Sequence, residues 1–246
     1  MPLRLSPAKF VAILQPWAEV AEPIHRRLAQ LVDAEPGQEV LWVGCGAGRS
    51  VLWWAQRFET HVQGIDPDAT AVEAAEVAAR ASQLARLASF QAAECTNLPH
   101  EARVFDVCVA NLLQLAEADG GQVVAELARV ARPMGTVAAL VPCWLSAPAP
   151  EDEQAMLELG LRPALLVEWK NRFRVSGVVE LVVEDTSLDG RWISPGWVGL
   201  LLRGWRAARW AGVRAVLSRE FRVLRALAQR RTLGLSIVKG TRWPHE

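Results

Sequence analysis

The 246-residue sequence contains no tyrosine, few cysteines and no long apolar run. Apolar runs such as Val137–Val141 fall far short of the ~20 residues that span a bilayer. The N-terminal run Phe10–Leu14 is followed by Gln15, Pro16 and the acidic Glu19, which is not the pattern of a signal peptide. A transmembrane or secreted protein is therefore not expected.

The four cysteines are Cys45, Cys95, Cys108 and Cys143. They form no C-x-x-C motif and no evident pairing pattern, so we expect reduced thiols in a cytoplasmic protein. The four histidines and four cysteines also show no metal-ligand spacing, and no metal site is predicted.

The overall composition is that of a folded protein with no net charge. Hydrophobic residues make up 51% and charged residues 22%, with a mean hydropathy of +0.13. This is enough apolar material for a packed core. Lys and Arg total 27 and Asp and Glu total 27, so the chain is not the globally basic protein that nucleic-acid binding would favour.

Charge is nevertheless segregated along the chain. Residues 1–190 carry 15 basic and 25 acidic side chains, whereas residues 191–246 carry 12 basic and two acidic ones, with five tryptophans among them. Three interpretations stay open for this basic, Trp-rich stretch. It can form an extra packing layer with a solvated face, a cap over the substrate, or helices in peripheral contact with an anionic membrane surface.

Strands and helices alternate between residues 39 and 141, which is typical of a doubly wound α/β sheet with parallel strands. Helices are expected from Ser6, at about Trp17–Val32, and at Arg49–Phe58, Thr70–Leu84, Gln122–Ala131, Ala164–Ser176, Ser194–Val216 and Ser218–Arg231. Strands are expected at Glu39–Val43, His61–Ile65, Ala88–Ala92, Val104–Val109, Thr136–Val141, Val178–Val183 and Leu233–Lys239.

The most informative segment joins the first of these strands to its helix. There, Gly44, Gly46 and Gly48 alternate with Cys45 and Ala47. Glycine is needed where the backbone turns with positive φ or where a ligand approaches closely. The amide groups of the following helix can receive a carboxylate or a phosphate.

The second strand ends at Asp66, whose carboxylate can accept both hydroxyls of a ribose. Two ligands fit this pattern. A dinucleotide fingerprint G-x-G-x-x-G would need a third glycine where Arg49 stands. The compact G-x-G-x-G loop better suits a nucleoside that carries an amino acid at its 5′ position.

With these residues in view, the chain resembles the class I S-adenosylmethionine-dependent methyltransferases, and it looks closest to the branch with quinone-biosynthesis and other small-molecule enzymes. The matching segments are residues 43–48, Val62–Pro67, Ala93–Pro99, Phe105–Val107 and Glu126–Gly135. The resemblance implies a Rossmann-like, seven-stranded, mostly parallel sheet with helices on both faces. It also implies N-terminal cap helices over residues 1–36, a methyltransferase domain over 37–246 and a helical insertion at about 191–231.

The resemblance further implies S-adenosylmethionine as the cofactor, with Asp66 on the ribose, Glu94 on the adenine amino group and a Cys95 amide on the ring. The implied cofactor-binding residues are Gly44, Cys45, Gly46, Gly48, Asp66, Pro67, Glu94, Cys95, Ala110 and Asn111. The chain departs from the family at Trp42, where an acid that helps to hold the cofactor's amino group is usual. Ala93 and Met134 replace customary glycines.

Methyl transfer from a sulfonium mainly requires alignment of the reacting atoms, so no catalytic constellation is expected and none is identified. Asn111, after the fourth strand, can orient a substrate or simply form a turn. His25 is the candidate base by position, although a surface histidine is the commoner role for such a residue. The expected function is methylation of a small organic molecule at oxygen or carbon. The alternatives are a non-catalytic S-adenosylmethionine-binding protein and an NAD-dependent oxidoreductase.

Overall fold

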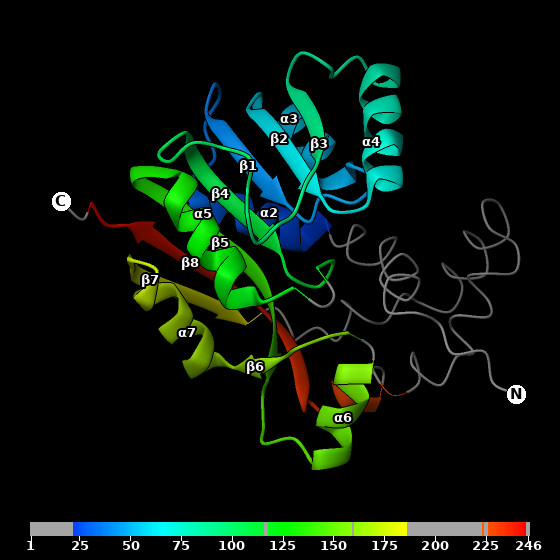
Figure 1. Cartoon of the computed structure of the whole chain (residues 1–246), viewed down its shortest axis with the longest axis vertical. Helices are drawn as coiled ribbons and strands as arrows, with labels where there is room; N and C mark the ends of the chain where they lie inside the picture. Colours follow the sequence, from blue (N-terminus) through cyan, green and yellow to red (C-terminus); the bar gives the residue numbers. More distant parts are fainter. Residues whose placement is uncertain (1–21, 116–117, 159, 186–222, 224–225, 245–246) are drawn as a thin grey trace, which may run out of the picture.

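The computed structural model describes residues 22–115, 118–158, 160–185, 223 and 226–244 (Figure 1). Its helices are α2 (Glu22–Val32), α3 (Arg49–Phe58), α4 (Ala69–Ala81), α5 (Gly120–Val130), α6 (Pro150–Glu158) and α7 (Leu166–Val175). Its strands are β1 (Glu39–Val43), β2 (His61–Asp66), β3 (Ala88–Ala92), β4 (Phe105–Asn111), β5 (Ala131–Trp144), β6 (Ala164–Leu165), β7 (Val178–Asp185) and β8 (Leu233–Arg242).

The strands form one sheet in the order β3-β2-β1-β4-β5-β8-β7, and the short β6 pairs with β5 beside this path. Strands β1 to β5 run parallel, whereas β8 is antiparallel to both β5 and β7. The predicted Rossmann-like, mostly parallel sheet is therefore confirmed. Because β1 lies between β2 and β4, the chain changes direction across the sheet there, and ligands bind beside such a switch point at the carboxyl ends of the strands.

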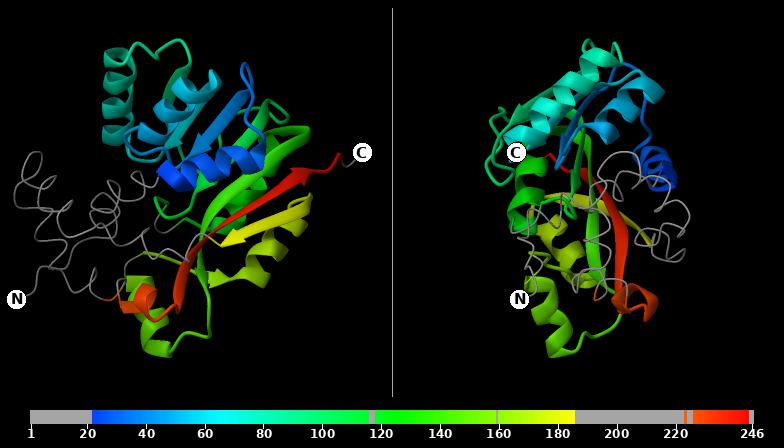
Figure 2. Two further views of the ribbon diagram at one scale, coloured as in Figure 1. Left: turned by 180° about the vertical axis from the view of Figure 1, so that it is seen from behind. Right: turned by 90° about the vertical axis from the view of Figure 1, so that its right-hand side faces the viewer.

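Helices cover both faces of the sheet (Figure 2). On one face, α5 and α7 bury Leu127, Trp169 and Phe173 in a core cluster with β4 and β5. On the other face, α2 and α3 bury Leu28 and Trp54 in a second cluster with β1 and β8. Alternate side chains of the central strands feed each cluster, as expected for strands buried on both faces.

Two of the helices that follow parallel strands begin at an aspartate. The Asp68 carboxylate accepts hydrogen bonds from the amides of Thr70 and Ala71 at the start of α4. The Asp119 carboxylate does the same for Gly121 and Gln122 at the start of α5. Such N-caps satisfy amide groups that have no acceptor within the helix. They place both helix starts near the carboxyl ends of β2 and β4.

The structure corrects several predicted boundaries. Helix α4 ends at Ala81 rather than at Leu84, because the Ser82 hydroxyl bonds back to the Ala78 carbonyl and Gln83 has a φ of 60°. Strand β5 starts at Ala131 and ends at Trp144, so it is longer than predicted. Helix α6 was not predicted, although it begins at Pro150 and carries three acids in its first turn.

Several predictions fall on other parts of the chain. The helix expected from Ser6, the start of the helix at Trp17–Val32 and most of the helical insertion at 191–231 lie outside the described residues. The interpretations of the basic, Trp-rich stretch therefore stay predictions. Among the residues that the structure describes, no helix is both long and apolar enough to cross a membrane.

Candidate functional site

The glycine loop between β1 and α3 is a tight turn held by backbone hydrogen bonds. Gly44, Gly46 and Gly48 all have positive φ angles, of 76°, 51° and 82°. The Gly44 amide donates to the Ile65 carbonyl at the end of β2, and the Gly48 amide donates to the Cys45 carbonyl. The loop therefore lies against the carboxyl end of β2, and the amides of the first turn of α3 follow directly after it.

Gly44 also has a steric reason to lack a side chain. A Cβ at this position would lie 2.8 Å from the Asn111 carbonyl oxygen and 3.2 Å from Leu115 Cγ. The turn after β4 thus packs directly on the glycine loop. This contact could not be predicted, because nothing in the sequence distinguishes Leu115 from other apolar residues.

Asp66 faces the loop, as the ribose-binding hypothesis requires. Its Oδ2 accepts a hydrogen bond of 2.7 Å from the Gly46 amide, and its Oδ1 accepts one of 3.0 Å from the Asp68 amide. Its side chain is buried, and burial raises the pKa of the carboxyl group, although both amide bonds act in the opposite direction. A carboxylate has about four acceptor sites, so each oxygen keeps one for a ligand hydroxyl.

The segment after β3 joins the same edge. The Ala93 amide donates to the Asp66 carbonyl, which places Glu94 and Cys95 beside the end of β2. Glu94 is exposed, and Cys95 is buried. Burial and the nearby Asp66 charge raise the pKa of the Cys95 thiol to about 12 despite a hydrogen bond from the Gly44 backbone. The thiol is therefore protonated at neutral pH and is a poor nucleophile.

The remaining predicted site residues differ in their surroundings. Pro67 is exposed just after Asp66, and Ala110 is buried beside Val43 in the pairing of β1 with β4. Asn111 is buried, and its Oδ1 accepts a hydrogen bond of 3.2 Å from the Leu113 amide. This contact favours the turn-forming interpretation of Asn111 over the substrate-orienting one.

Trp42 and His25 are both buried. Trp42 is fully buried in the cluster formed with α2 and α3, so its indole lies within the core. His25 is also buried, which contradicts the surface interpretation. Burial lowers the pKa of His25 to about 4, so it is a weak base and a poor candidate for general-base catalysis.

A partly buried ion pair joins the segment after β3 to α5. Glu126 accepts from the Leu98 amide at 2.7 Å and pairs with Arg129, whose guanidinium also donates to the carbonyls of Leu98 and His100. The hydrogen bond from Arg129 is the main reason that the pKa of Glu126 is lowered. This pair positions the segment that carries Glu94 and Cys95. The i, i+3 spacing is typical of an ion pair on a helix, but nothing in the sequence indicated its contacts with Leu98 and His100.

We expect Glu126→Gln to lower the free energy of unfolding by about 1–2 kcal/mol at pH 7, because it removes the charge from partly exposed hydrogen bonds. A carboxyl with a lowered pKa stabilises the fold above its ordinary pKa, and this contribution disappears as the pH falls through the lowered value. Urea unfolding at several pH values should therefore show the difference from the wild type shrinking below about pH 4. A constant difference would contradict this account.

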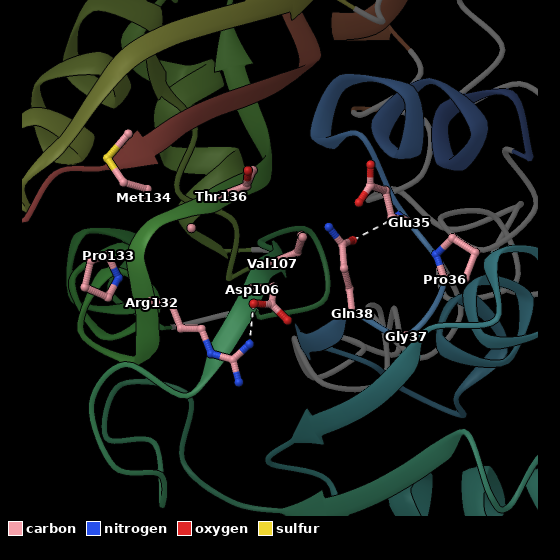
Figure 3. Close-up of a pocket in the computed structure, with 11 residues that line it drawn as sticks. Glu35, Pro36, Gly37, Gln38, Asp106, Val107, Arg132, Pro133, Met134 and Thr136 are labelled. Atoms are coloured by element: carbon pink, nitrogen blue, oxygen red, sulfur yellow. Dashed lines mark hydrogen bonds and ion pairs between the residues drawn. The ribbon is translucent and has the colours of Figure 1, made fainter.

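A separate pocket of about 470 Å³ lies at the opposite, amino edge of the sheet (Figure 3). It is lined by residues 35–38, 106–107 and 132–136. Its Asp106 carboxylate pairs with Arg132 and accepts a hydrogen bond from the Glu39 amide. This pocket has no contact with the glycine loop. We therefore assign the functional site to the carboxyl edge.

The candidate site is compatible with an adenosyl cofactor. The left-handed glycines bring backbone close to the space beside Asp66, and both Asp66 oxygens have spare acceptor capacity. Asp66 would hold the ribose hydroxyls, and the Cys95 amide would lie on the base side. Among the residues that the structure describes, no group of three or more His, Cys, Asp or Glu side chains could hold a metal ion.

Comparisons with known proteins agree with this geometry. Residues 40–135 match the profile of a family described as a methyltransferase domain. Two curated relatives are "Methyltransferase GfsG" of Streptomyces halstedii, 33% identical over 51% of this chain and 45% of its own length, and chloroplastic tocopherol O-methyltransferase of Arabidopsis thaliana, 30% identical over 58% and 43%. The chain thus spans less than half the length of these two relatives.

Solved structures give the same fold. A putative sarcosine dimethylglycine methyltransferase from Galdieria sulphuraria aligns over 90% of this chain and 84% of its own, with a TM-score of 0.76 and 14% identity. The [4+2]-cyclase SpnF aligns over 91% and 81%, with a TM-score of 0.72 and 21% identity. The chain therefore has the fold of these structures, and its matched segment is similar to a methyltransferase domain. Within the chain, residues 40–135 are the part that matches the methyltransferase-domain profile.

Proposed function

We propose that this protein binds S-adenosylmethionine and transfers its methyl group to a small organic acceptor. The observation that carries the proposal is the contact between Asp66 and Gly46. This contact holds the Asp66 carboxylate, for which we propose the ribose-binding role, against a left-handed glycine loop within a segment that matches a methyltransferase domain. When bound, S-adenosylmethionine supplies a methyl group already activated on a sulfonium.

The protein's own part in this reaction is alignment. The loop glycines admit the amino-acid portion, and Asp66 fixes the sugar. The turn after β4, at Asn111 to Leu115, packs against Gly44 and borders the place where the methyl group would lie. Holding an acceptor in line with this methyl group can supply much of the rate enhancement, because it replaces a bimolecular encounter.

The acceptor is proposed to be a small molecule methylated at oxygen or carbon. Support comes from the names of relatives and neighbours, which include the O-methyltransferase rstn1 of Aspergillus nomiae and a geranyl diphosphate C-methyltransferase from Streptomyces coelicolor A3(2). These proteins act on different molecules, so the acceptor has to be found by screening. The family fold also hosts a cyclase, so binding alone is insufficient and a methylated product must be detected.

Calorimetric titration with S-adenosylmethionine, S-adenosylhomocysteine and NAD tests the cofactor assignment. We expect micromolar binding of the two adenosyl compounds and none of NAD. Mass spectrometry of reactions with a panel of phenols, hydroxy acids and prenylated acceptors then seeks a product 14 Da heavier, the mass of an added CH₂. Binding of NAD in place of the adenosyl compounds would refute the proposal, and cofactor binding without any product would favour a non-catalytic binding protein.

A further inference from the structure

His25 makes a buried hydrogen bond to the first turn of the helix that follows the glycine loop. It belongs to α2, and its Nε2 lies 3.1 Å from Ser50 Oγ. Both side chains are at least nine-tenths buried, at 3% and 4% exposed. Because burial keeps the imidazole neutral at neutral pH, the bond joins two uncharged groups in an apolar setting.

Ser50 is two residues beyond Gly48 and is the second residue of α3. Its own amide is one of the first-turn groups that have no acceptor within the helix. Any shift of Ser50 therefore shifts the amides that face a ligand of the glycine loop. The contact with His25 restrains this turn from the side where α2 packs with β1 and α3.

The other neighbours of His25 in this cluster include aromatic rings. The His25 ring lies 5.5 Å from the Trp42 ring and 6.0 Å from the Trp53 ring, measured between centroids, and Trp42 in turn contacts Trp54. The indole nitrogens of Trp42 and Trp54 are buried and have no hydrogen-bond partner. These two indoles therefore contribute packing to the cluster and do not orient the loop through hydrogen bonds.

We propose that His25 is a positioning residue for the cofactor loop and acts through Ser50. His25 holds the first turn of α3 in one orientation. In that orientation the amides of this turn, and the loop joined to Asp66 through Gly46, contact the same ligand. The proposal rests on the proposed function for the identity of the ligand, but the restraint on the loop exists without any ligand. Preorganisation of this kind raises affinity because the ligand does not have to order the loop.

The test measures the dissociation constant of S-adenosylhomocysteine in His25→Phe, Ser50→Ala and the double variant. Phenylalanine keeps the packing of the ring and removes the hydrogen bond. We expect each single change to weaken binding roughly 3- to 10-fold, the range for one buried neutral hydrogen bond, and the double variant to be no weaker than the singles. His25→Gln, whose amide can reach the place of Nε2, should restore most of the affinity.

Val32→Ala is the matched control, since Val32 is buried on the same helix and lies two turns from His25. It should lower the melting temperature at least as much as His25→Phe yet leave the dissociation constant unchanged. If Val32→Ala weakens binding equally, or if His25→Phe binds as the wild type does, His25 has only a structural role and the proposal is overturned.

Hydrogen exchange in the ligand-free protein separates this inference from the proposed function. The amides of residues 46–51 should exchange faster in His25→Phe and Ser50→Ala than in the wild type and in Val32→Ala. Should the wild type fail to bind S-adenosylhomocysteine while this exchange pattern holds, the cofactor assignment is wrong and the loop restraint stands. Unchanged exchange in both variants would refute the restraint itself.

Discussion

Asp66→Asn is expected to weaken the binding of S-adenosylmethionine by about 10- to 100-fold, because hydrogen bonds to a charged acceptor contribute about 1.5–3 kcal/mol each. The ribose hydroxyls donate hydrogen bonds to the side-chain oxygens at position 66, and asparagine offers one such oxygen in place of two. Each Asp66 oxygen already accepts a hydrogen bond, one from the Gly46 amide and one from the Asp68 amide. The NH₂ group that replaces one of these oxygens in asparagine would therefore face another donor. Calorimetric titration of the variant measures the loss.

The same substitution should have two opposing effects on stability. Burial raises the pKa of Asp66, so the folded protein binds its proton more tightly than the unfolded chain. The contribution of this group to stability therefore falls as the pH rises from its ordinary pKa through the raised one. Removing the charge relieves that penalty, while one unmatched amide costs about 1–3 kcal/mol. We expect these two effects to cancel to within about 2 kcal/mol in the free energy of unfolding, measured with urea.

Affinity and stability should also respond to pH in opposite directions at this residue. As the pH falls toward the raised pKa of Asp66, its carboxylate is lost and cofactor binding weakens, whereas the stability contribution of the group improves. The Asn variant should show neither change. Asp68→Asn is the matched control, because it removes an equal charge two residues away at an exposed helix cap that asparagine also supports. Equal losses of affinity in both variants would refute the role assigned to Asp66.

Much of the site's framework could be predicted because local signals agree there with the tertiary structure. The strands Glu39–Val43 and Ala88–Ala92 and the helix Arg49–Phe58 have the predicted bounds. A short apolar run followed by a glycine predicts a buried strand that ends in a turn with positive φ. The position of Asp66 follows from the same logic, since parallel neighbours bring their carboxyl ends to one edge.

What sequence reasoning missed depends on contacts between distant segments. His25 contacts Ser50 only because α2 packs on the face of β1, and no spacing along the chain encodes that pairing. The extension of β5 beyond Val141 depends on its antiparallel partner, since Trp144 pairs with Leu233. Helix α6 had usable signals in Pro150 and its first-turn acids, but the prolines before it favoured a loop.

Gly48→Ala is expected to cause the largest loss of stability among these substitutions, about 2–5 kcal/mol, with cofactor binding impaired in the same variant. Gly48 has a φ of 82°, and an added Cβ would lie 2.7 Å from Ala75 Cβ and 2.8 Å from the Phe90 ring. Left-handed backbone costs about 1–2 kcal/mol for a residue other than glycine, and overpacking adds about 1–3 kcal/mol. The Phe90 ring can rotate aside, but the Ala75 Cβ is fixed to the α4 backbone.

Gly37 separates these two contributions. Its φ of 79° is nearly that of Gly48, but a Cβ there would meet nothing within 4 Å. Gly37→Ala should therefore cost only the conformational part, about 1–2 kcal/mol, and should leave cofactor affinity intact because Gly37 lies at the amino edge of the sheet. Urea unfolding of both variants gives the steric part as the difference between them. If both variants lose the same stability, α4 is free to move away from the loop, and close packing is not what requires glycine at position 48.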